Sequence, residues 1–162
     1  MIFITLGSQK FPFPRVLDYV QSLIERGVIS EPVFAQTGYT KIDSYSFECK
    51  PFISRAKYLS EISICRIMIT HAGTGAIISG LENHKKVIAV PREKKYSEHV
   101  DNHQFEISSA FSAAGYIEIA RDEQELATAI QCVNSHQYKN YQSNTDKYIR
   151  FLESRLRGKN EK

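Results

Sequence analysis

The sequence lacks the features that mark membrane-spanning, secreted or disulfide-bonded proteins. Its N-terminal apolar run covers only residues 2–6 before Gly-Ser-Gln, which is too short for the core of a secretory signal. No stretch approaches the roughly 20 apolar residues of a membrane span. The three cysteines, Cys49, Cys65 and Cys132, are far apart and form no CxxC pair. We therefore expect reduced thiols, packed as small apolar side chains, in a cytoplasmic protein.

Several motifs of nucleotide and metal chemistry are also missing. No G-x-G-x-x-G follows the first apolar run, no P-loop lysine is present, and no Asp-x-Asp pair offers ligands to a metal. His99 and His103 have i, i+4 spacing, but nothing supplies a third ligand, so we expect neither a metal site nor a cofactor. The net charge of +3 is small and no basic face stands out, which argues against a nucleic-acid partner.

Short apolar segments alternate with amphipathic ones along the whole chain. With 42% hydrophobic and 24% charged residues in 162, the composition is that of one globular domain, which we place at 1–157 with a disordered tail at 158–162. The predicted strands are 2–6, 32–37, 66–70, 87–90 and 116–119, with a possible short strand at 45–48. The predicted helices are 13–26, 54–62, 75–83, 99–114, 123–133 and 141–156. This alternation predicts an α/β fold with a doubly wound, mostly parallel, Rossmann-like sheet.

Two glycine turns follow predicted strands, and parallel sheets bind ligands at the carboxyl ends of their strands. The first is Gly7-Ser8-Gln9, where the backbone N–H groups and the Ser8 hydroxyl could cradle a phosphate. The second, residues 71–75, precedes a helix whose N-terminus favours an anion. Either turn is also compatible with a plain connection that packs a helix on the sheet.

A third candidate is the polar stretch at 91–104, PREKKYSEHVDNHQ. It crowds two histidines, an aspartate, an asparagine and a glutamine around the start of a predicted helix. A solvated helix start, capped by Ser97 or Glu98, explains the same pattern. From the residues alone, the three segments indicate a phosphorylated ligand and no more.

Three blocks of the chain, in order and with their spacing preserved, carry a resemblance to a known family. They are MIFITLGSQKFPFPRVL, ITHAGTGAIISGL and KKVIAVPREKKYSEHVDNHQFEIS. The chain resembles the family 28 glycosyltransferases of the GT-B fold. More closely it is similar to the PssE-like exopolysaccharide subunits and to the small subunit of the dolichol-pathway UDP-GlcNAc transferase. The resemblance implies the fold of the C-terminal, donor-binding half of a GT-B enzyme.

The resemblance also implies a set of residues that bind a UDP-sugar donor. They are Gly7, Ser8 and Gln9 at the diphosphate; His71, Ala72, Gly73, Thr74 and Gly75 before the donor-site helix; Pro91 and Arg92 at the uracil or sugar pocket; and His99, Asp101, Asn102, His103 and Gln104 near the sugar and diphosphate. Many relatives have a ribose-binding glutamate where this chain has Ser79. A hydroxyl cannot accept two hydrogen bonds as a carboxylate does, so the ribose contact at Ser79 is in doubt.

The resemblance further implies half of an enzyme, because GT-B transferases bind donor and acceptor in different domains. The sequence starts at the first strand of the donor half. We therefore expect a membrane-anchored, PssD-like partner that holds a lipid-linked saccharide acceptor and supplies the general base, with no catalytic residue in this chain. The partner would recruit the protein to the inner face of the membrane, and the predicted helix 141–156 would contact either the partner or its own sheet.

The expected reaction is inverting, metal-independent transfer from a UDP-sugar in exopolysaccharide or capsule synthesis. Helix N-termini and loop N–H groups would stabilise the leaving diphosphate. Two other functions remain open: an NAD-type enzyme with the same topology, and a non-catalytic accessory subunit that activates or anchors a partner transferase. No residue identifies the sugar, the linkage or the stoichiometry.

Overall fold

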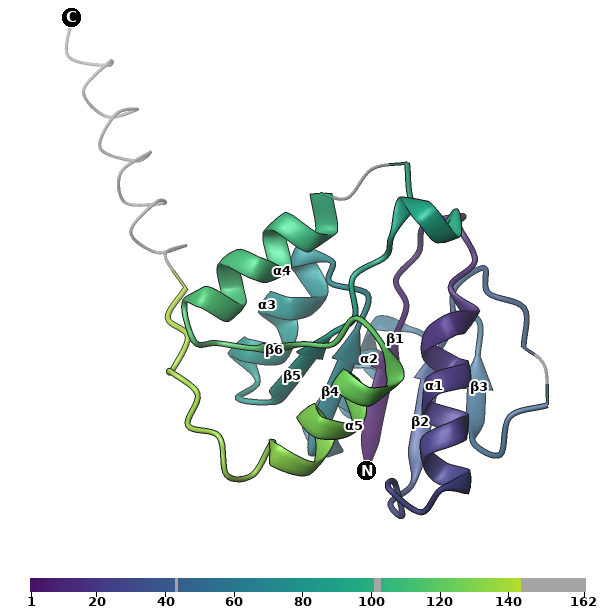
Figure 1. Ribbon diagram of the computed structural model, residues 1–162, viewed down its shortest axis with the longest axis horizontal. Coiled ribbons are helices and arrows are strands. Elements are labelled where there is room, and N and C mark those ends of the chain that lie inside the picture. The colour runs from purple at the N-terminus through teal and green to yellow at the C-terminus, as the bar shows by residue number, and fades with distance from the viewer. Residues whose placement is uncertain (43, 101–102, 144–162) are drawn as a thin grey trace, which may run out of the picture.

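A six-stranded, fully parallel sheet forms the centre of the molecule (Figure 1). In this computed structural model the described residues are 1–42, 44–100 and 103–143. The strand order is β3-β2-β1-β4-β5-β6. The strands are β1 Ile2–Thr5, β2 Val33–Gln36, β3 Glu48–Lys50, β4 Ile67–Thr70, β5 Lys86–Ala89 and β6 Glu118–Ile119. The predicted doubly wound, Rossmann-like α/β fold is confirmed.

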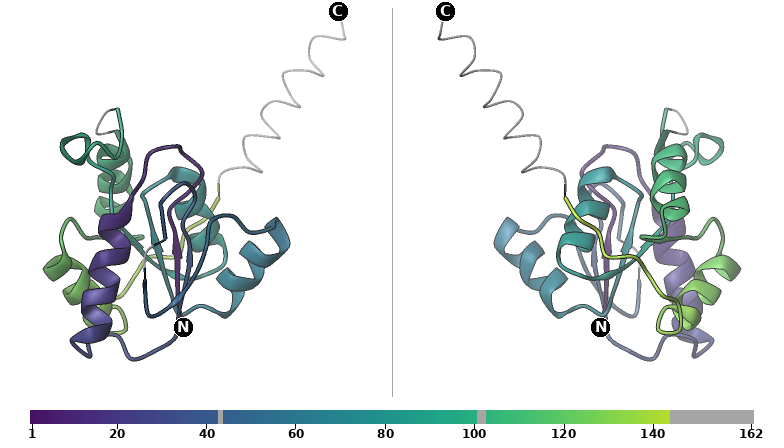
Figure 2. Two further views of the ribbon diagram at one scale, coloured as in Figure 1. Left: turned by 90° about the vertical axis from the view of Figure 1, so that its right-hand side faces the viewer. Right: turned by 90° about the vertical axis from the view of Figure 1, so that its left-hand side faces the viewer.

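Helices cover both faces of the sheet. They are α1 Pro14–Glu25, α2 Arg55–Ile64, α3 Thr74–Glu82, α4 His103–Ala113 and α5 Glu123–Cys132, with a 3₁₀ turn η1 at Lys94–Tyr96. Figure 2 shows α1 and α5 on one side of the sheet and α2 and α3 on the other. Within the described part of the chain, no helix combines the length and the apolar character needed to span a bilayer.

The inner strands are apolar because both of their faces are covered. β1, β2 and β4 are buried along their whole length, as expected for parallel strands between two helical layers. Alternate side chains of β1 enter different cores: Ile2 and Ile4 pack with α1 and α5, whereas Phe3 packs with Ile62 of α2. This two-sided packing holds the strand ends, and the loops that follow them, in place.

Local signals set several helix boundaries as predicted. Pro14 stands at the start of α1, and Gly27 follows its C-cap with φ of 71°. Ser54 caps α2 by accepting a hydrogen bond from the N–H of Lys57 (3.2 Å). Asp122 caps α5 by accepting from the N–H of Glu125 (2.8 Å).

Other boundaries differ from the predictions. The short strand lies at 48–50 instead of 45–48, and the last strand has two residues. The helix predicted at 99–114 is found at 103–113, and Ser97 takes a left-handed conformation (φ 58°) at the end of η1. Cys132 is exposed, not buried. Residues 141–143 are not helical, and the rest of the predicted helix 141–156 and of the domain end lies outside the described residues.

Candidate functional site

The carboxyl ends of β1 and β4 lie side by side where the chain changes direction across the sheet. β1 pairs with β2 on one side and with β4 on the other. The chain runs outward from β1 to β3 and then returns to β4. Open α/β sheets bind ligands outside the carboxyl ends of their strands at such a switch point. The two glycine turns, 7–9 and 71–75, follow these two strands and therefore meet there.

A hollow of about 600 Å³ opens at this point, and we call it the switch-point hollow. Both glycine turns contribute to its lining, through Gly7, Ser8, Gln9, His71, Gly73 and Gly75. Two predicted residues of the second turn do not line it: Ala72 is buried with φ of 65°, and Thr74 is the exposed first residue of α3. The structure thus brings together two turns that are more than 60 residues apart in the sequence.

The imidazole of His71 explains why both turns carry glycine. A Cβ atom at Gly7 would lie 2.6 Å from Cε1 and from Nε2 of His71, and one at Gly73 would lie 2.3 Å from Nε2. Gly7 also has φ of 74°, which L side chains disfavour. The ring therefore occupies the space between the two turns, and any larger residue at either position would displace it.

Hydrogen bonding and burial define the state of His71. Its Nδ1 lies 3.2 Å from the carbonyl oxygen of Thr5, and we assign the proton to this nitrogen because a carbonyl can only accept. Burial lowers the pKa of His71 to about 4, although the bond to Thr5 opposes the shift. At neutral pH the ring is uncharged, and its Nε2 is an acceptor at the switch-point hollow.

Gln36 ties the ends of three strands together behind the hollow. Its Nε2 donates to the carbonyls of Gly7 (3.2 Å) and Pro51 (3.0 Å), and its Oε1 accepts from the Thr5 hydroxyl (2.8 Å). The backbone just after β2 also approaches closely, because a Cβ at Gly38 would lie 2.5 Å from the carbonyl oxygen of Gly7. The first glycine turn is therefore anchored at its start.

The N-terminus of α3 supplies hydrogen-bond donors to the hollow. Its N-cap, Gly73, has no side chain to accept from the first-turn N–H groups, and the first turn contains no acidic residue. Gly75 and Ala76, both in this turn, line the hollow. The first N–H groups of a helix have no partner within it, and together with the helix dipole they attract anions.

The opposite wall of the hollow was missed by the sequence analysis. Phe52, Ile53, Arg55 and Tyr58 follow β3 and open α2, and they line the hollow together with Thr5, Gln36 and Ala76. Their signal was weak because β3 was placed too early in the sequence, so residues 52–53 were not recognised as following a strand end. The wall is apolar, with one exposed cation at Arg55.

Ser79 lies beside Tyr58 and does not line the hollow. Burial raises the pKa of the Tyr58 hydroxyl, and contacts with Thr5 and Ser79 partly oppose this. Ser79, the position at which the resemblance implies a ribose contact, thus lies one helical turn beyond Ala76 and next to the hydroxyl of Tyr58.

In the loop after β5, residues 90–100, the side chains of Arg92 and Glu98 turn inward, whereas Lys94 and Lys95 are exposed; we call this loop the polar loop. Arg92 is 1% exposed, and its guanidinium donates to the carbonyls of Leu6 (2.8 Å), Phe11 (2.6 Å) and Glu98 (3.1 Å). It does not line the switch-point hollow. The expected position of Arg92 at the edge of a uracil or sugar pocket therefore differs from the position in this structure.

Glu98 is equally buried and does not cap α4. Its carboxylate binds the guanidinium of Arg15 through two hydrogen bonds (2.9 and 2.8 Å) and accepts from the N–H of Glu93 (3.0 Å). Burial disfavours the charge on Arg15, but the bonds to Glu98 raise its pKa above the ordinary value. The capping role considered for Glu98 is wrong, because an ion pair with α1 occupies its side chain.

Among the described residues, Pro91, His99 and Gln104 do not line the switch-point hollow. Pro91 borders a second hollow of about 460 Å³ with Tyr96 and Phe105. The ring of His99 lies 6.0 Å from that of Phe11. Gln104 is buried, and its Oε1 accepts from the N–H of Arg92 (3.4 Å). His103 begins α4, whereas Asp101 and Asn102 lie outside the described residues.

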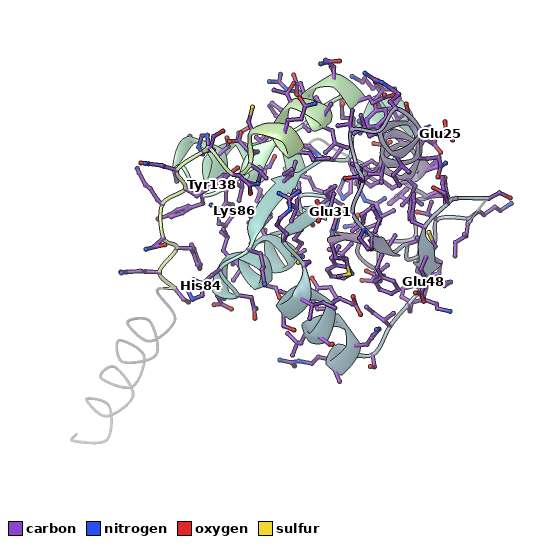
Figure 3. All side chains as sticks on the ribbon, turned by 90° about the horizontal axis from the view of Figure 1, so that it is seen from below. Glu25, Glu31, Glu48, His84, Lys86 and Tyr138 are labelled. Carbon is purple, nitrogen blue, oxygen red and sulfur yellow. The ribbon has the colours of Figure 1, made fainter. Side chains whose placement is uncertain are left out.

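The amino edge of the sheet carries charged and aromatic side chains. Figure 3 views this edge, with Glu31 near its centre and Lys86 beside Tyr138. Glu31 accepts from the N-terminal ammonium group (2.6 Å) and pairs with Arg66. The ammonium of Lys86 lies 4.5 Å from the centre of the Tyr138 ring. At this edge the side chains therefore bind one another.

Comparisons with known proteins agree with this geometry. The model of the glycosyltransferase family 28 C-terminal domain matches residues 1–156. No curated protein has a matching sequence. Similar solved structures include the glycotransferase of kitacinnamycin, with 14% identity, 83% of this chain and 34% of that chain covered, and a TM-score of 0.61.

Two further structures are similar over more of this chain. ALG13 has 20% identity and a TM-score of 0.57, with 93% of each chain covered. MurG of Acinetobacter baumannii has 17% identity and a TM-score of 0.55, with 93% of this chain and 48% of MurG covered. The chain thus spans about a third of the kitacinnamycin enzyme and about half of MurG. At these identities the likeness establishes the fold.

Proposed function

Because the chain belongs to the glycosyltransferase family 28 C-terminal domain family, we propose that it is the UDP-sugar-binding part of a two-component inverting glycosyltransferase. The observation that carries the proposal is the meeting of two glycine turns and the uncapped N-terminus of α3 at one hollow. Glycine exposes backbone N–H groups, and a diphosphate needs several such donors at close range.

The two walls of the switch-point hollow suit the two ends of a nucleoside diphosphate. The side formed by Gly7, Ser8 and the start of α3 offers hydrogen-bond donors to the phosphates. The side formed by Phe52, Ile53 and Tyr58 offers an apolar surface to a flat base. We therefore propose that the base lies against residues 52–58 and the diphosphate against the glycine turns.

In this proposal the chain stabilises the leaving group and does not activate the acceptor. Negative charge grows on UDP as the sugar leaves. Fixed N–H dipoles are effective at stabilising such charge because they need no reorganisation during the reaction. The general base that deprotonates the acceptor hydroxyl is assigned to a partner, as is the binding of a lipid-linked saccharide.

Exposed apolar side chains around the hollow support the existence of that partner. Among the described residues, the exposed large apolar side chains on loops at the carboxyl edge and in the first turn of α4 are Phe11, Tyr39, Ile42, Phe52, Tyr96, Val100 and Phe105. Exposed apolar side chains on loops at one edge of the sheet suit contact with another macromolecule. We propose a membrane-anchored, PssD-like partner, with a role in exopolysaccharide or capsule synthesis at the cytoplasmic face of the membrane.

A thermal-unfolding experiment with the isolated chain tests donor binding. UDP or a UDP-sugar at about a hundred times its Kd stabilises a protein by about 2.7 kcal/mol, and we expect a matching rise in Tm. NAD serves as the rival ligand, because an NAD-type enzyme with this topology would respond to it instead. A response to NAD and none to UDP would overturn the proposal.

The requirement for a partner is tested separately. The chain alone and the chain co-expressed with the neighbouring reading frame are compared for transfer from a panel of UDP-sugars to membranes bearing lipid-linked saccharide. We expect turnover only with both proteins. Sugar transfer by the single chain would contradict the two-component proposal, and turnover by the partner without UDP binding by this chain would favour a non-catalytic accessory role.

A further inference from the structure

Arg92 is a fully buried cation whose guanidinium, among the residues that the structure describes, is bonded to no carboxylate. The nearest candidate, Glu98, uses its carboxylate for Arg15, and only its backbone carbonyl accepts from Arg92. The Nε of Arg92 is buried and has no hydrogen-bond partner. Burial lowers the pKa of this guanidinium to about 10. Burying a charge without a paired counter-charge is costly, so the surrounding structure must compensate through the bonds that Arg92 makes.

Those bonds enclose the first glycine turn. Arg92 donates to the carbonyl of Leu6, directly before Gly7, and to the carbonyl of Phe11, directly after Lys10. Within the described part of the chain, Ser8, Gln9 and Lys10 make no hydrogen bond of their own. Apart from the bond from Gln36 to the Gly7 carbonyl, the conformation of this turn depends on the guanidinium that joins its two ends.

The same bonds set the direction of an N–H group. In a trans peptide the C=O and the following N–H point in opposite directions. Because the Leu6 carbonyl points at Arg92, the Gly7 N–H points away from it. A third bond, to the Glu98 carbonyl (3.1 Å), fixes the guanidinium within the polar loop. The Cζ atom of Arg92 also lies 4.9 Å from the centre of the Phe13 ring.

We propose that Arg92 is a positioning residue, which clasps the two ends of the Gly7–Lys10 turn from behind and holds its N–H groups toward the diphosphate. This inference rests on the proposed function only for the identity of the ligand. In this proposal Arg92 does not contact the donor directly. Its side chain is 1% exposed and does not line the hollow, so it cannot reach a ligand there.

Backbone ¹⁵N relaxation tests the clasp without any ligand. In Arg92→Lys, which keeps the charge and loses the fork of donors, the order parameters of residues 7–10 should fall from about 0.85, the rigid range, toward about 0.6 or below. Those of β1 and β4 should stay in the rigid range. Arg15→Lys is the matched control, because that guanidinium binds Glu98, Pro91 and Arg121 but neither end of the turn. Unchanged order parameters of residues 7–10 in Arg92→Lys would overturn the proposal.

A titration of the wild-type protein with UDP covers the case in which Arg92→Lys fails to fold. The amide signals of Gly7, Ser8 and Gln9 should shift, while the side-chain N–H signals of Arg92 should show no coupling to ³¹P. Direct coupling would make Arg92 a ligand-binding residue and overturn its positioning role. If UDP does not bind at all, the proposed ligand is wrong, and the order parameters of residues 7–10 still decide the role of Arg92. In a folded Arg92→Lys variant, the Kd for UDP should rise roughly tenfold or more.

Discussion

The glycine turns and the polar loop were both predicted to contact the donor, and the structure uses them in opposite ways. The glycine turns form one wall of the switch-point hollow, largely with backbone. The polar loop is rich in charged residues, yet Arg92 and Glu98 are buried in contacts with the protein itself. A charged residue in a loop therefore need not face a ligand.

The largest expected effect is a loss of stability when the buried ion pair between Arg15 and Glu98 is broken. Glu98→Gln leaves the Arg15 guanidinium without its carboxylate, and loss of one partner of a buried pair costs about 3–5 kcal/mol. Urea unfolding measures this loss. The matched control is Glu123→Gln, which breaks the more exposed pair with Arg26 (2.6 Å) and should cost less than about 1 kcal/mol. Equal losses of unfolding free energy in the two variants would show that the Arg15–Glu98 ion pair does not stabilise the fold.

The next largest effect should come from a single methyl group in a glycine turn. Gly7→Ala brings a Cβ to 2.6 Å from the His71 ring, and the displacement should weaken UDP binding about a hundredfold, as a 1 Å misplacement in a preorganised site does. Gly27→Ala is the matched control: it has a similar φ of 71° but nothing within 4 Å of the new Cβ.

Calorimetric titration with UDP separates these two variants. Both should lose about 1–2 kcal/mol of stability from the left-handed backbone, but only Gly7→Ala should lose affinity. If Gly27→Ala loses as much affinity as Gly7→Ala, backbone strain and not the collision with His71 explains the result.

A smaller effect concerns the pH dependence of stability. His71 has a folded-state pKa of about 4, below its ordinary 6.5, so the folded protein keeps the ring neutral while the unfolded chain takes up a proton. The stabilisation is present above pH 6.5 and is lost as the pH falls toward 4. We expect a loss of about 2 kcal/mol between pH 7 and pH 5.

Urea unfolding at the two pH values, in wild type and His71→Gln, isolates this contribution. The variant should lose about 2 kcal/mol less than wild type over the same interval. His84→Asn controls for an exposed histidine, since Asn tolerates the left-handed backbone at that position (φ 55°). An unchanged pH dependence in His71→Gln would mean that the ring is not held neutral.

The smallest effect should come from the one hydroxyl in the first glycine turn. Ser8 is exposed, so Ser8→Ala should change stability by less than about 0.5 kcal/mol. Loss of one hydrogen bond to the phosphate should raise the Kd for UDP by roughly tenfold or less. Ser30→Ala, at an exposed serine outside the hollow, should leave the Kd unchanged. A hundredfold loss in Ser8→Ala would mean that side chains, and not backbone N–H groups, dominate the site.

The sequence predicted the fold and the glycine turns because both depend on local patterns. Runs such as Ile2–Leu6 are apolar on both faces, and Pro14 and Gly27 mark the ends of one helix by backbone geometry alone. The placement of both glycine turns at one edge then follows from the parallel sheet, since the carboxyl ends of parallel strands share an edge.

The inward orientation of Arg92 and Glu98 could not be predicted from the sequence. The Arg92 guanidinium is held by the carbonyls of Leu6 and Phe11, which are 86 and 81 positions away in the sequence. No local sequence pattern reports contacts over such a separation. The strand β3 was misplaced for a related reason: its three residues, Glu48 to Lys50, alternate exposed and half-buried at the sheet edge. With that edge misplaced, the wall at Phe52 and Ile53 could not be recognised.

The uncapped start of α3 has a practical consequence for the choice of buffer. Its first-turn N–H groups attract any small oxyanion, and phosphate or sulfate ions suit such a position. Titrations carried out in phosphate buffer or with sulfate salts would therefore measure exchange of one anion for another and understate the affinity for UDP. Chloride-based buffers with an organic amine, at fixed ionic strength, avoid that competition.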